Sequence, residues 1–282
     1  MRYFVAVARH LHFGRAAAEL HIAQPVLSRQ IRALETELHA SLFRRDKRST
    51  ELTAAGRQLL ADAVPLLAGA EALRRRAARA ARGPDRFVVG FMPGLIVTGA
   101  VRAIRERHPG LTVDLLRTGW NDQTDVVHDG RVDVSYVRLP IDKRGLSLRP
   151  LLGEPRVAML PAAHRLAGKE TIEIAELADD HLLQDPAAVP EWRDVATPRP
   201  EIGRPSNGRP IYAVEEKLEH VASGRGIVVL PLSTARFYTR PDVVWARIAD
   251  IPPNRVSLAW ESTRRDPLIA EFAALAEEFP AA

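Results

Sequence analysis

The residues best suited to recognise another molecule lie on one side of a short segment near the amino terminus, QPVLSRQIRALE. Two sets of residues in and just after this segment each follow the spacing of one helix face. The polar set is Pro25, Ser28, Arg29 and Arg32, and the apolar set is Leu27, Ile31, Leu34 and Leu38. At the start of the helix, Gln24 can pair with adenine, Arg29 with guanine O6 and N7, and Ser28 with a phosphate or a base edge.

Two shorter helical segments precede this helix and must hold it in place. Residues 3–11 carry one apolar face, and residues 15–20 form a short Ala-rich helix. Residues 21–23 leave room only for a tight turn. Pro25 suits the first turn of the next helix because its missing N–H would have no intrahelical partner there. The pattern predicts a helix-turn-helix whose second helix enters the major groove of DNA.

A basic tract after this helix supports the same interpretation. Taken alone, Ser28, Arg29 and Arg32 are more typical of a solvated helix face than of a DNA contact. Residues 43–53, however, place apolar ends around the basic middle RRDKRS. This arrangement suits a β-hairpin wing whose cationic tip reaches phosphates or a minor groove. A basic hairpin after a basic-faced helix predicts an all-α, winged helix-turn-helix domain that binds DNA.

The charge of the chain is unevenly distributed. The net charge is +5, and residues 1–82 carry +8 while residues 83–282 carry −3. A basic first third favours a polyanionic partner, although basic helices rich in Ala and Arg are common for other reasons. The chain has no cysteine, which excludes disulfides and thiolate metal sites and fits a reducing cytoplasm. No apolar run approaches the roughly 20 residues of a membrane span.

Catalytic and metal-binding motifs are missing from the sequence. There is no GxSxG, no GxxxxGK[ST] and no HExxH, and GRG at 224–226 lacks the third glycine of a phosphate-binding loop. The nine histidines are scattered without metal-ligand spacing. We therefore expect no enzyme activity, no cofactor and no metal. A transported-solute receptor would need export, which the basic head argues against. An architectural DNA-binding protein remains as an alternative.

A long helix is expected after the wing. Six small or apolar residues repeat at the spacing of a heptad seam. They are Leu59, Ala63, Leu66, Ala70, Leu73 and Ala77. This seam favours a two-stranded contact with a second copy over packing on its own domain. We expect Pro65 to kink this helix or divide it in two, and the pair at residues 83–84, Gly-Pro, to end it.

The last two hundred residues alternate between strand and helix patterns. Strands are expected at 87–91, 111–116, 132–137, 156–160, 181–183 and 226–231, and helices at 95–107, 122–128, 174–177, 214–223 and 266–279. The order β-α-β-α-β predicts a parallel sheet with right-handed crossovers, and the second set of elements predicts a second lobe. The fold class is therefore α/β with two Rossmann-like lobes and a cleft between them.

A ligand of such a domain would lie outside the carboxyl ends of the strands, near helix amino termini that favour an anion. This rule selects Gly94, Leu95, Trp120, Asn121, Arg138, Gln184 and Asp185. The planar fork of Arg138 matches a carboxylate, although an ion pair between the lobes would use it equally well. Trp120 fits either an aromatic ligand or packing between the lobes.

These residues resemble a known family. FxRAAxxLHIAQPxLSRQI, then LFRR, then LTxAG closely resemble the DNA-binding head of LysR-type transcriptional regulators, over about sixty residues without a gap. DGRVDVSYVRLP, IAELADDHLL and VASGRGIVVLP fit the family's effector domain less specifically. Family members usually have a few more residues before the first helix, so we expect a trimmed chain or a misassigned start.

The resemblance implies contacts and domains. Gln24, Pro25, Ser28 and Arg29 would face the major groove, Arg32 would be the next contact, and Arg45 or Arg48 of the wing would meet the minor groove or backbone. The domains would span 1–53, 54–83 and 84–282. The last would have one lobe at about 86–155 plus 251–282 and another at about 156–250. In the family's aromatic-catabolism branch a Ser stands near Gly94 and a Thr near Trp120; both are absent here, so backbone amides and Asn121 would substitute or the ligand differs.

The resemblance also implies partners. A homodimer through the linker helix, or a homotetramer, would bind a partly palindromic DNA operator. It would respond to a small effector, with a carboxylate suspected, and would work with RNA polymerase in the cytoplasm, on the nucleoid.

Overall fold

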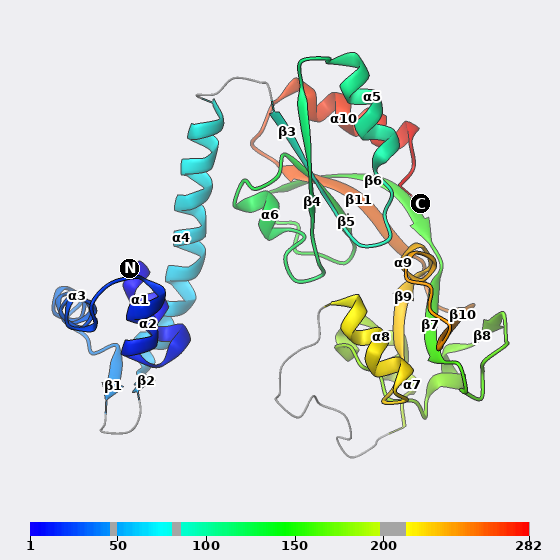
Figure 1. Ribbon diagram of the computed structural model, residues 1–282, viewed down its shortest axis with the longest axis horizontal. Helices are drawn as coiled ribbons and strands as arrows, with labels where there is room; N and C mark the ends of the chain where they lie inside the picture. Colours follow the sequence, from blue (N-terminus) through cyan, green and yellow to red (C-terminus); the bar gives the residue numbers. More distant parts are fainter. Residues whose placement is uncertain (46–49, 81–85, 198–212, 282) are drawn as a thin grey trace. The chain divides into compact units, whose positions relative to one another are not determined.

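The chain divides into two compact units, Met1–Arg79 and Ala80–Ala282. The computed structural model describes residues 1–45, 50–80, 86–197 and 213–281. Figure 1 shows the helices and strands of each unit. Within the described residues, no helix is long and apolar enough to cross a membrane.

The first unit is a three-helix cluster with a β-hairpin and one long helix. Its elements are α1 (Arg2–His10), α2 (Phe13–Glu19), α3 (Gln24–Glu37), β1 (Phe43–Arg45), β2 (Thr50–Leu52) and α4 (Ala54–Ala80). The ring of Phe43, on β1, lies 5.5 Å from that of Phe4 and 5.8 Å from that of Phe13, measured between centroids. The hairpin is thereby fixed to α1 and α2. The predicted winged helix-turn-helix is confirmed.

Helix α4 is continuous over 27 residues and contains Pro65. Of the two outcomes expected at this proline, a kink or a division of the helix, the division does not occur, since α4 continues on both sides of it. The predicted seam has two parts. Ala63 is 1% exposed and belongs to the core of the first unit, whereas Leu66 and Leu73 are 66% and 62% exposed.

The first lobe of the second unit is built on a five-stranded sheet in the order β4-β3-β5-β11-β6. Its strands are β3 (Arg86–Phe91), β4 (Thr112–Arg117), β5 (Val134–Arg138), β6 (Leu146–Glu154) and β11 (Asn254–Glu261). The first three are parallel, as predicted, but β11 runs antiparallel to both β5 and β6. The sheet is therefore mixed, because β11 carries the chain back from the second lobe and enters the sheet from the opposite end.

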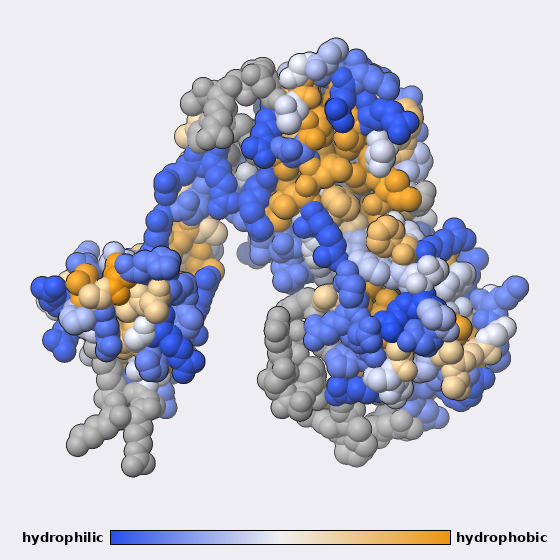
Figure 2. Space-filling view, in the orientation of Figure 1, coloured by the Kyte–Doolittle hydropathy of each residue, from blue (hydrophilic) through white to orange (hydrophobic). Residues whose placement is uncertain are grey.

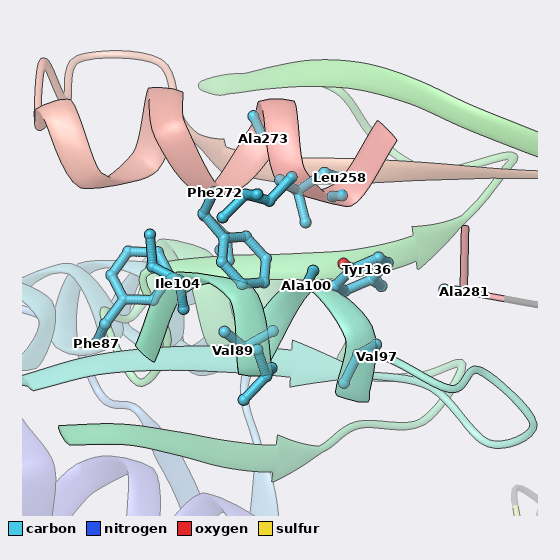
Figure 3. Close-up of a cluster of buried hydrophobic side chains, with 14 of the residues drawn as sticks. Phe87, Val89, Val97, Ala100, Ile104, Tyr136, Leu258, Phe272, Ala273 and Ala281 are labelled. Atoms are coloured by element: carbon cyan, nitrogen blue, oxygen red, sulfur yellow. The ribbon is translucent and has the colours of Figure 1, made fainter. Parts of the chain in front are cut away.

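The core of the first lobe lies between this sheet and two helices, α5 (Thr98–Arg107) and α10 (Pro267–Glu278). The ring centroid of Phe272, on α10, is 5.3 Å from that of Phe87 and 6.3 Å from that of Tyr136. Figure 3 shows side chains of both helices and of the sheet pointing toward one another there. The short helix α6 (Asp125–His128) contributes Val126 and Val127 to a separate small cluster.

The second lobe has a four-stranded sheet in the order β8-β10-β7-β9. Its strands are β7 (Arg156–Pro161), β8 (Thr171–Ile172), β9 (Val228–Pro231) and β10 (Val243–Ile248). Its helices are η1 (Ile174–Leu177), η2 (Pro186–Ala188), α7 (Pro190–Val195), α8 (Val214–Ala222) and α9 (Leu232–Phe237). The strand expected at 181–183 is reduced to one bridge, between Leu182 and Ile227.

Candidate DNA-binding and effector sites

The five residues predicted on the polar side of α3 lie together on its outer face. Gln24, Pro25, Arg29 and Arg32 are exposed and Ser28 is half-buried. Of the four apolar residues predicted on the opposite face, Leu27 and Ile31 are buried and Leu34 is half-buried, whereas Leu38, at the end of the helix, is 42% exposed. In Figure 2 the region of α3, at the far left of the view, is mostly hydrophilic. Proline in the first turn starts the helix where the turn after α2 ends. The geometry presents an amide, a hydroxyl and two guanidinium groups along one helix.

Glu35 ties α3 to the wing. Its carboxylate Oε1 accepts hydrogen bonds from the backbone N–H groups of Leu42, at 2.8 Å, and Phe43, at 3.2 Å. Both donors are main-chain N–H groups at the start of the hairpin. Without Glu35, these N–H groups would need water as their hydrogen-bond acceptor. Sequence reasoning missed this residue. Its position four residues after Ile31, on the apolar side of the helix, was the available signal.

Thr53 and Gly56 lock the end of the hairpin to the start of α4. The Thr53 hydroxyl donates to the carbonyl oxygen of Ser41 at 2.7 Å and accepts from the backbone N–H of Gly56 at 3.0 Å. A Cβ at Gly56 would lie 2.2 Å from the carbonyl oxygen of Leu42. Only glycine allows this close approach, so the glycine of the LTxAG motif is a geometric requirement of the wing.

The two wing residues expected to contact DNA are only partly described. Arg45 forms the end of β1, where it pairs with Thr50 across the hairpin. Arg48 lies outside the described residues. Neighbouring Arg44 is exposed and forms an ion pair with Glu51 on the facing strand.

The loop after β3 contacts the second lobe directly. Gly94 has a φ of +84°, and a Cβ there would lie 2.5 Å from Cα of Thr234 at the start of α9. The hydroxyl of Thr234 donates to the carbonyl oxygen of Pro93 at 3.0 Å. The next residue, Leu95, is 5% exposed and belongs to the core of the first lobe. This loop therefore brings backbone, and no free polar side chain, to the boundary between the lobes.

Arg138, at the end of β5, is the centre of a buried polar network. Its guanidinium pairs with Glu154 and donates to Oδ1 of Asn254 at 2.8 Å and to Oγ of Ser233 at 2.9 Å. Glu154 also accepts from the backbone N–H of Ser233 at 2.7 Å. The network joins the two points where the chain passes between the lobes to the first turn of α9. The ion pair expected between the lobes lies instead within the first lobe, because Arg138 and Glu154 both belong to its sheet, and each of them bonds Ser233 of the second lobe.

Burial and ion pairing act in opposite directions on Arg138. The side chain is 1% exposed, and this desolvation lowers the pKa of Arg138, while Glu154 raises it. Because arginine starts from a very high value, the group remains a cation. A cation so deeply buried requires its anion, so the pair is stable only when both members are present.

Trp120, in the loop after β4, lies between the lobes. It is half-buried and packs against the apolar clusters of both lobes. The ammonium Nζ of Lys217, on α8, is 5.7 Å from the centroid of its ring. Lys217 is 8% exposed, and burial lowers the pKa of this lysine.

Lys217 was missed by sequence reasoning although a signal for it existed. It lies on the face of α8 that also carries Val214, Leu218 and Val221, all of them buried. A lysine at i+3 of an apolar helix face is unusual and marks a position to examine.

A second polar group links the lobes nearer the surface. The Arg117 guanidinium donates to Oε1 of Glu215 and to the hydroxyl of Tyr238, both at 3.2 Å, and Tyr238 donates to the same Glu215 oxygen at 3.0 Å. The hydrogen bond with Tyr238 is the main cause that raises the pKa of Arg117. Arg117 ends β4 in one lobe, and its two partners belong to the other.

The remaining predicted residues have other contacts. Asn121 is exposed, one residue after Trp120. In the second lobe, Oε1 of Gln184 accepts from the backbone N–H of Val229 at 3.0 Å, and Asp185 accepts from the N–H of Ala187 at 2.9 Å. The loops after β3, β4 and β5 therefore meet at the boundary between the lobes, while Gln184 and Asp185 serve their own lobe. Among the described residues, no three acidic or histidine side chains are placed to hold a metal ion.

The fold and these sites define a class of protein: a regulator with a winged helix-turn-helix and a two-lobed domain of the kind that binds small molecules. Two family models match the chain. "Bacterial regulatory helix-turn-helix protein, lysR family" matches residues 1–57, and "LysR substrate binding domain" matches residues 84–280. The chain belongs to the LysR family of bacterial transcriptional regulators.

Individual relatives agree with this assignment. The chain is 30% identical to the Hca operon transcriptional activator HcaR of Escherichia coli, over 99% of this chain and 96% of HcaR. A solved structure of a Corynebacterium glutamicum OxyR mutant is 27% identical, with a TM-score of 0.55 over 98% of this chain and 90% of that one. CbnR, 24% identical, has the same fold, with a TM-score of 0.61 over 98% of this chain and 96% of that one. The protein is a DNA-binding transcriptional regulator with an effector-binding domain, and is not an enzyme.

Proposed function

We propose that this regulator binds a partly palindromic operator as a dimer or tetramer and changes state when a small anionic or aromatic metabolite binds between its two effector lobes. The observation that carries the proposal is the meeting of three strand-end loops of one lobe with α8 and α9 of the other. Charged side chains lie at this boundary, and two of them, Arg138 and Lys217, are buried. A ligand there would favour one arrangement of the lobes, provided its affinity for the two arrangements differs.

The operator contacts follow from the outer face of α3. Gln24 and Arg29 would read bases in the major groove, and Ser28 and Arg32 would contact bases or phosphates beside them. Arg45 or Arg48 of the wing would reach the minor groove or the backbone. The regulator would act in the cytoplasm, where it would bind chromosomal DNA with RNA polymerase as a partner.

The exposed part of the α4 seam supports a two-stranded contact. Leu66 and Leu73, seven residues apart, lie on one helix face and are more than half exposed. A dimer formed there would present two heads to two half-sites. In this proposal residues 1–53 bind DNA, residues 54–83 link and dimerise, and residues 84–282 bind the effector.

The proposal is tested by binding of the full-length protein to the intergenic DNA upstream of its own gene. Fluorescence anisotropy would compare this fragment with a scrambled one across a salt series, with and without a panel of aromatic and aliphatic carboxylates. We expect a preference of about a hundredfold or more for the native fragment, changed by one of the carboxylates. Equal, steeply salt-dependent binding to both fragments, indifferent to every compound, would instead indicate an architectural DNA-binding protein.

A further inference from the structure

Lys217 is a buried cation for which the described part of the chain supplies no anion. Its side chain lies on the apolar face of α8 and is 8% exposed, yet among the described residues its ammonium forms neither an ion pair nor a hydrogen bond. Its polar contact is with the face of Trp120, at 5.7 Å. An aromatic ring attracts a cation, but more weakly than a carboxylate does at low exposure to water.

The other cations between the lobes are already matched. Arg138 pairs with Glu154 in the interior, and Arg117 pairs with Glu215 nearer the surface. Among the described side chains that bridge the two lobes, Lys217 is the third cation, and two glutamates serve the other two. Within the described residues, the boundary thus has one positive charge without a negatively charged partner, next to an indole ring and apolar residues of both lobes.

We propose that Lys217 and Trp120 form the anion-recognising end of the effector site, and that the effector is a monocarboxylate with a flat apolar body. This inference rests on the proposed function and specifies the ligand class of that site. One carboxylate would supply the missing countercharge through a charge-assisted hydrogen bond with the ammonium. The ring of Trp120 would cover the apolar body, since flat unsaturated groups stack well on indole. A second charge on the ligand would meet no unpaired cation among the described side chains that bridge the lobes.

The apolar surroundings of Lys217 explain why a lysine at this position is informative. An unmatched ammonium among apolar residues destabilises the folded protein, and an apolar side chain of similar length would remove that penalty. If Lys217 served only to stabilise the fold, replacing it with an apolar side chain would not make the folded protein more stable. Lys217→Met should therefore leave the unliganded domain as stable as before, or more stable, while it weakens effector binding.

The experiment uses calorimetric titration of the full-length protein with four matched probes. Benzoate carries one charge and a flat ring, benzamide lacks the charge, phthalate adds a second charge, and acetate lacks the ring. We expect benzoate to bind at least about tenfold more tightly than each of the other three, as the loss of one charge-assisted contact or of a stacking surface would produce. Failure of benzoate to bind, or equal binding of benzamide, overturns the proposal.

Two variants complete the test. In Lys217→Met we expect benzoate affinity to fall by about tenfold or more, with an unchanged or higher thermal unfolding midpoint. Lys143→Met, which removes an exposed lysine of the first lobe, should leave both quantities unchanged. Undiminished benzoate binding by Lys217→Met, or a clear loss of its thermal stability, overturns the assignment.

The two proposals can fail separately. Operator-specific DNA binding that responds to a compound whose affinity is insensitive to Lys217→Met would leave the regulator function standing and reject this site. Benzoate binding that depends on Lys217, without any effect on operator binding, would keep the site and reject its role in the proposed response.

Discussion

At the scale of single residues, the described part of the boundary between the two lobes has two matched cations, Arg138 and Arg117, and one unmatched cation, Lys217. Arg138 is held by Glu154, Asn254 and Ser233, which come from the two chain crossings and from α9. Both members of the pair belong to the first lobe, so separating the lobes would expose the buried pair to water and break its hydrogen bonds with Ser233 of the second lobe. Lys217 has no such partner among the described residues. The two kinds of cation suit different roles. The Arg138–Glu154 pair favours one arrangement of the two lobes, whereas the unpaired ammonium of Lys217 can bind a ligand.

The first prediction concerns the buried pair. Arg138→Met leaves the Glu154 carboxylate buried without its cation, so we expect a loss of about 3–5 kcal/mol in the free energy of unfolding. The double variant Arg138→Met/Glu154→Gln removes the orphaned charge and keeps an acceptor for the backbone N–H of Ser233. It should recover much of this loss. Urea unfolding followed by circular dichroism measures both.

The control for this experiment is an exposed ion pair of the same lobe. Arg144 pairs with Asp142, and its side chain is 92% exposed. Arg144→Met should leave the urea midpoint unchanged, because water screens such pairs. A double variant no more stable than Arg138→Met would contradict the orphaned charge as the cause.

Sequence reasoning found residues where the signal is local, and missed them where it is not. The place of Gln24, Ser28 and Arg29 on the polar face of α3 was predictable, because helix periodicity over one segment separates the polar from the apolar face; their contacts with DNA stay a prediction. The partner of Arg138 could not be located in this way. Glu154 is 16 residues away along the chain and Asn254 is 116, and only the folded sheet brings them together. Lys217 is an intermediate case, since its place on an apolar face was visible in the sequence.

At the scale of elements, the strands with a local sequence signal could be predicted, and the strands without one were missed. Strand β3 was predicted because its apolar run lies between clear breaks. Strand β6 was missed since its sequence, LSLRPLLGE, contains a proline and little alternation. Its place at the sheet edge explains why the proline is tolerated there. Strand β11 was missed as well, and it decides that the sheet is mixed, because no local feature reveals the direction in which a returning strand enters.

The prediction at this scale concerns the seam of α4. Leu66→Glu/Leu73→Glu places two charges on the exposed stripe, where they would repel the same residues of a second copy. We expect loss of the dimer in sedimentation velocity and weaker operator binding, with an unchanged helix content. Ala61→Glu/Ala68→Glu is the matched control, since these residues are also exposed and seven positions apart but lie off the seam. The wild-type oligomeric state in the leucine variant would exclude this stripe as the interface.

At the scale of the whole molecule, the two ends of the chain have opposite charge and separate tasks. The basic first third carries +8 and suits DNA, and the remainder, which contains the effector-binding domain, carries −3. If the two tasks are coupled, each ligand must change the affinity for the other. Linkage requires the two factors to be equal, since both follow from one coupling free energy.

The last prediction is this reciprocity. Suppose a monocarboxylate changes the operator affinity by a certain factor, which for allosteric proteins is commonly about 5- to 150-fold. Saturating operator DNA should then change the affinity for that carboxylate by the same factor in the same direction. Calorimetric titration with the effector, in the presence of operator or scrambled DNA of equal length, measures it. With scrambled DNA we expect a smaller change, since non-specific contacts depend on phosphates and not on the arrangement of the two heads. Equal effector affinities with and without operator would mean that the lobes and the heads act independently, and the regulator would then need another way to pass the signal.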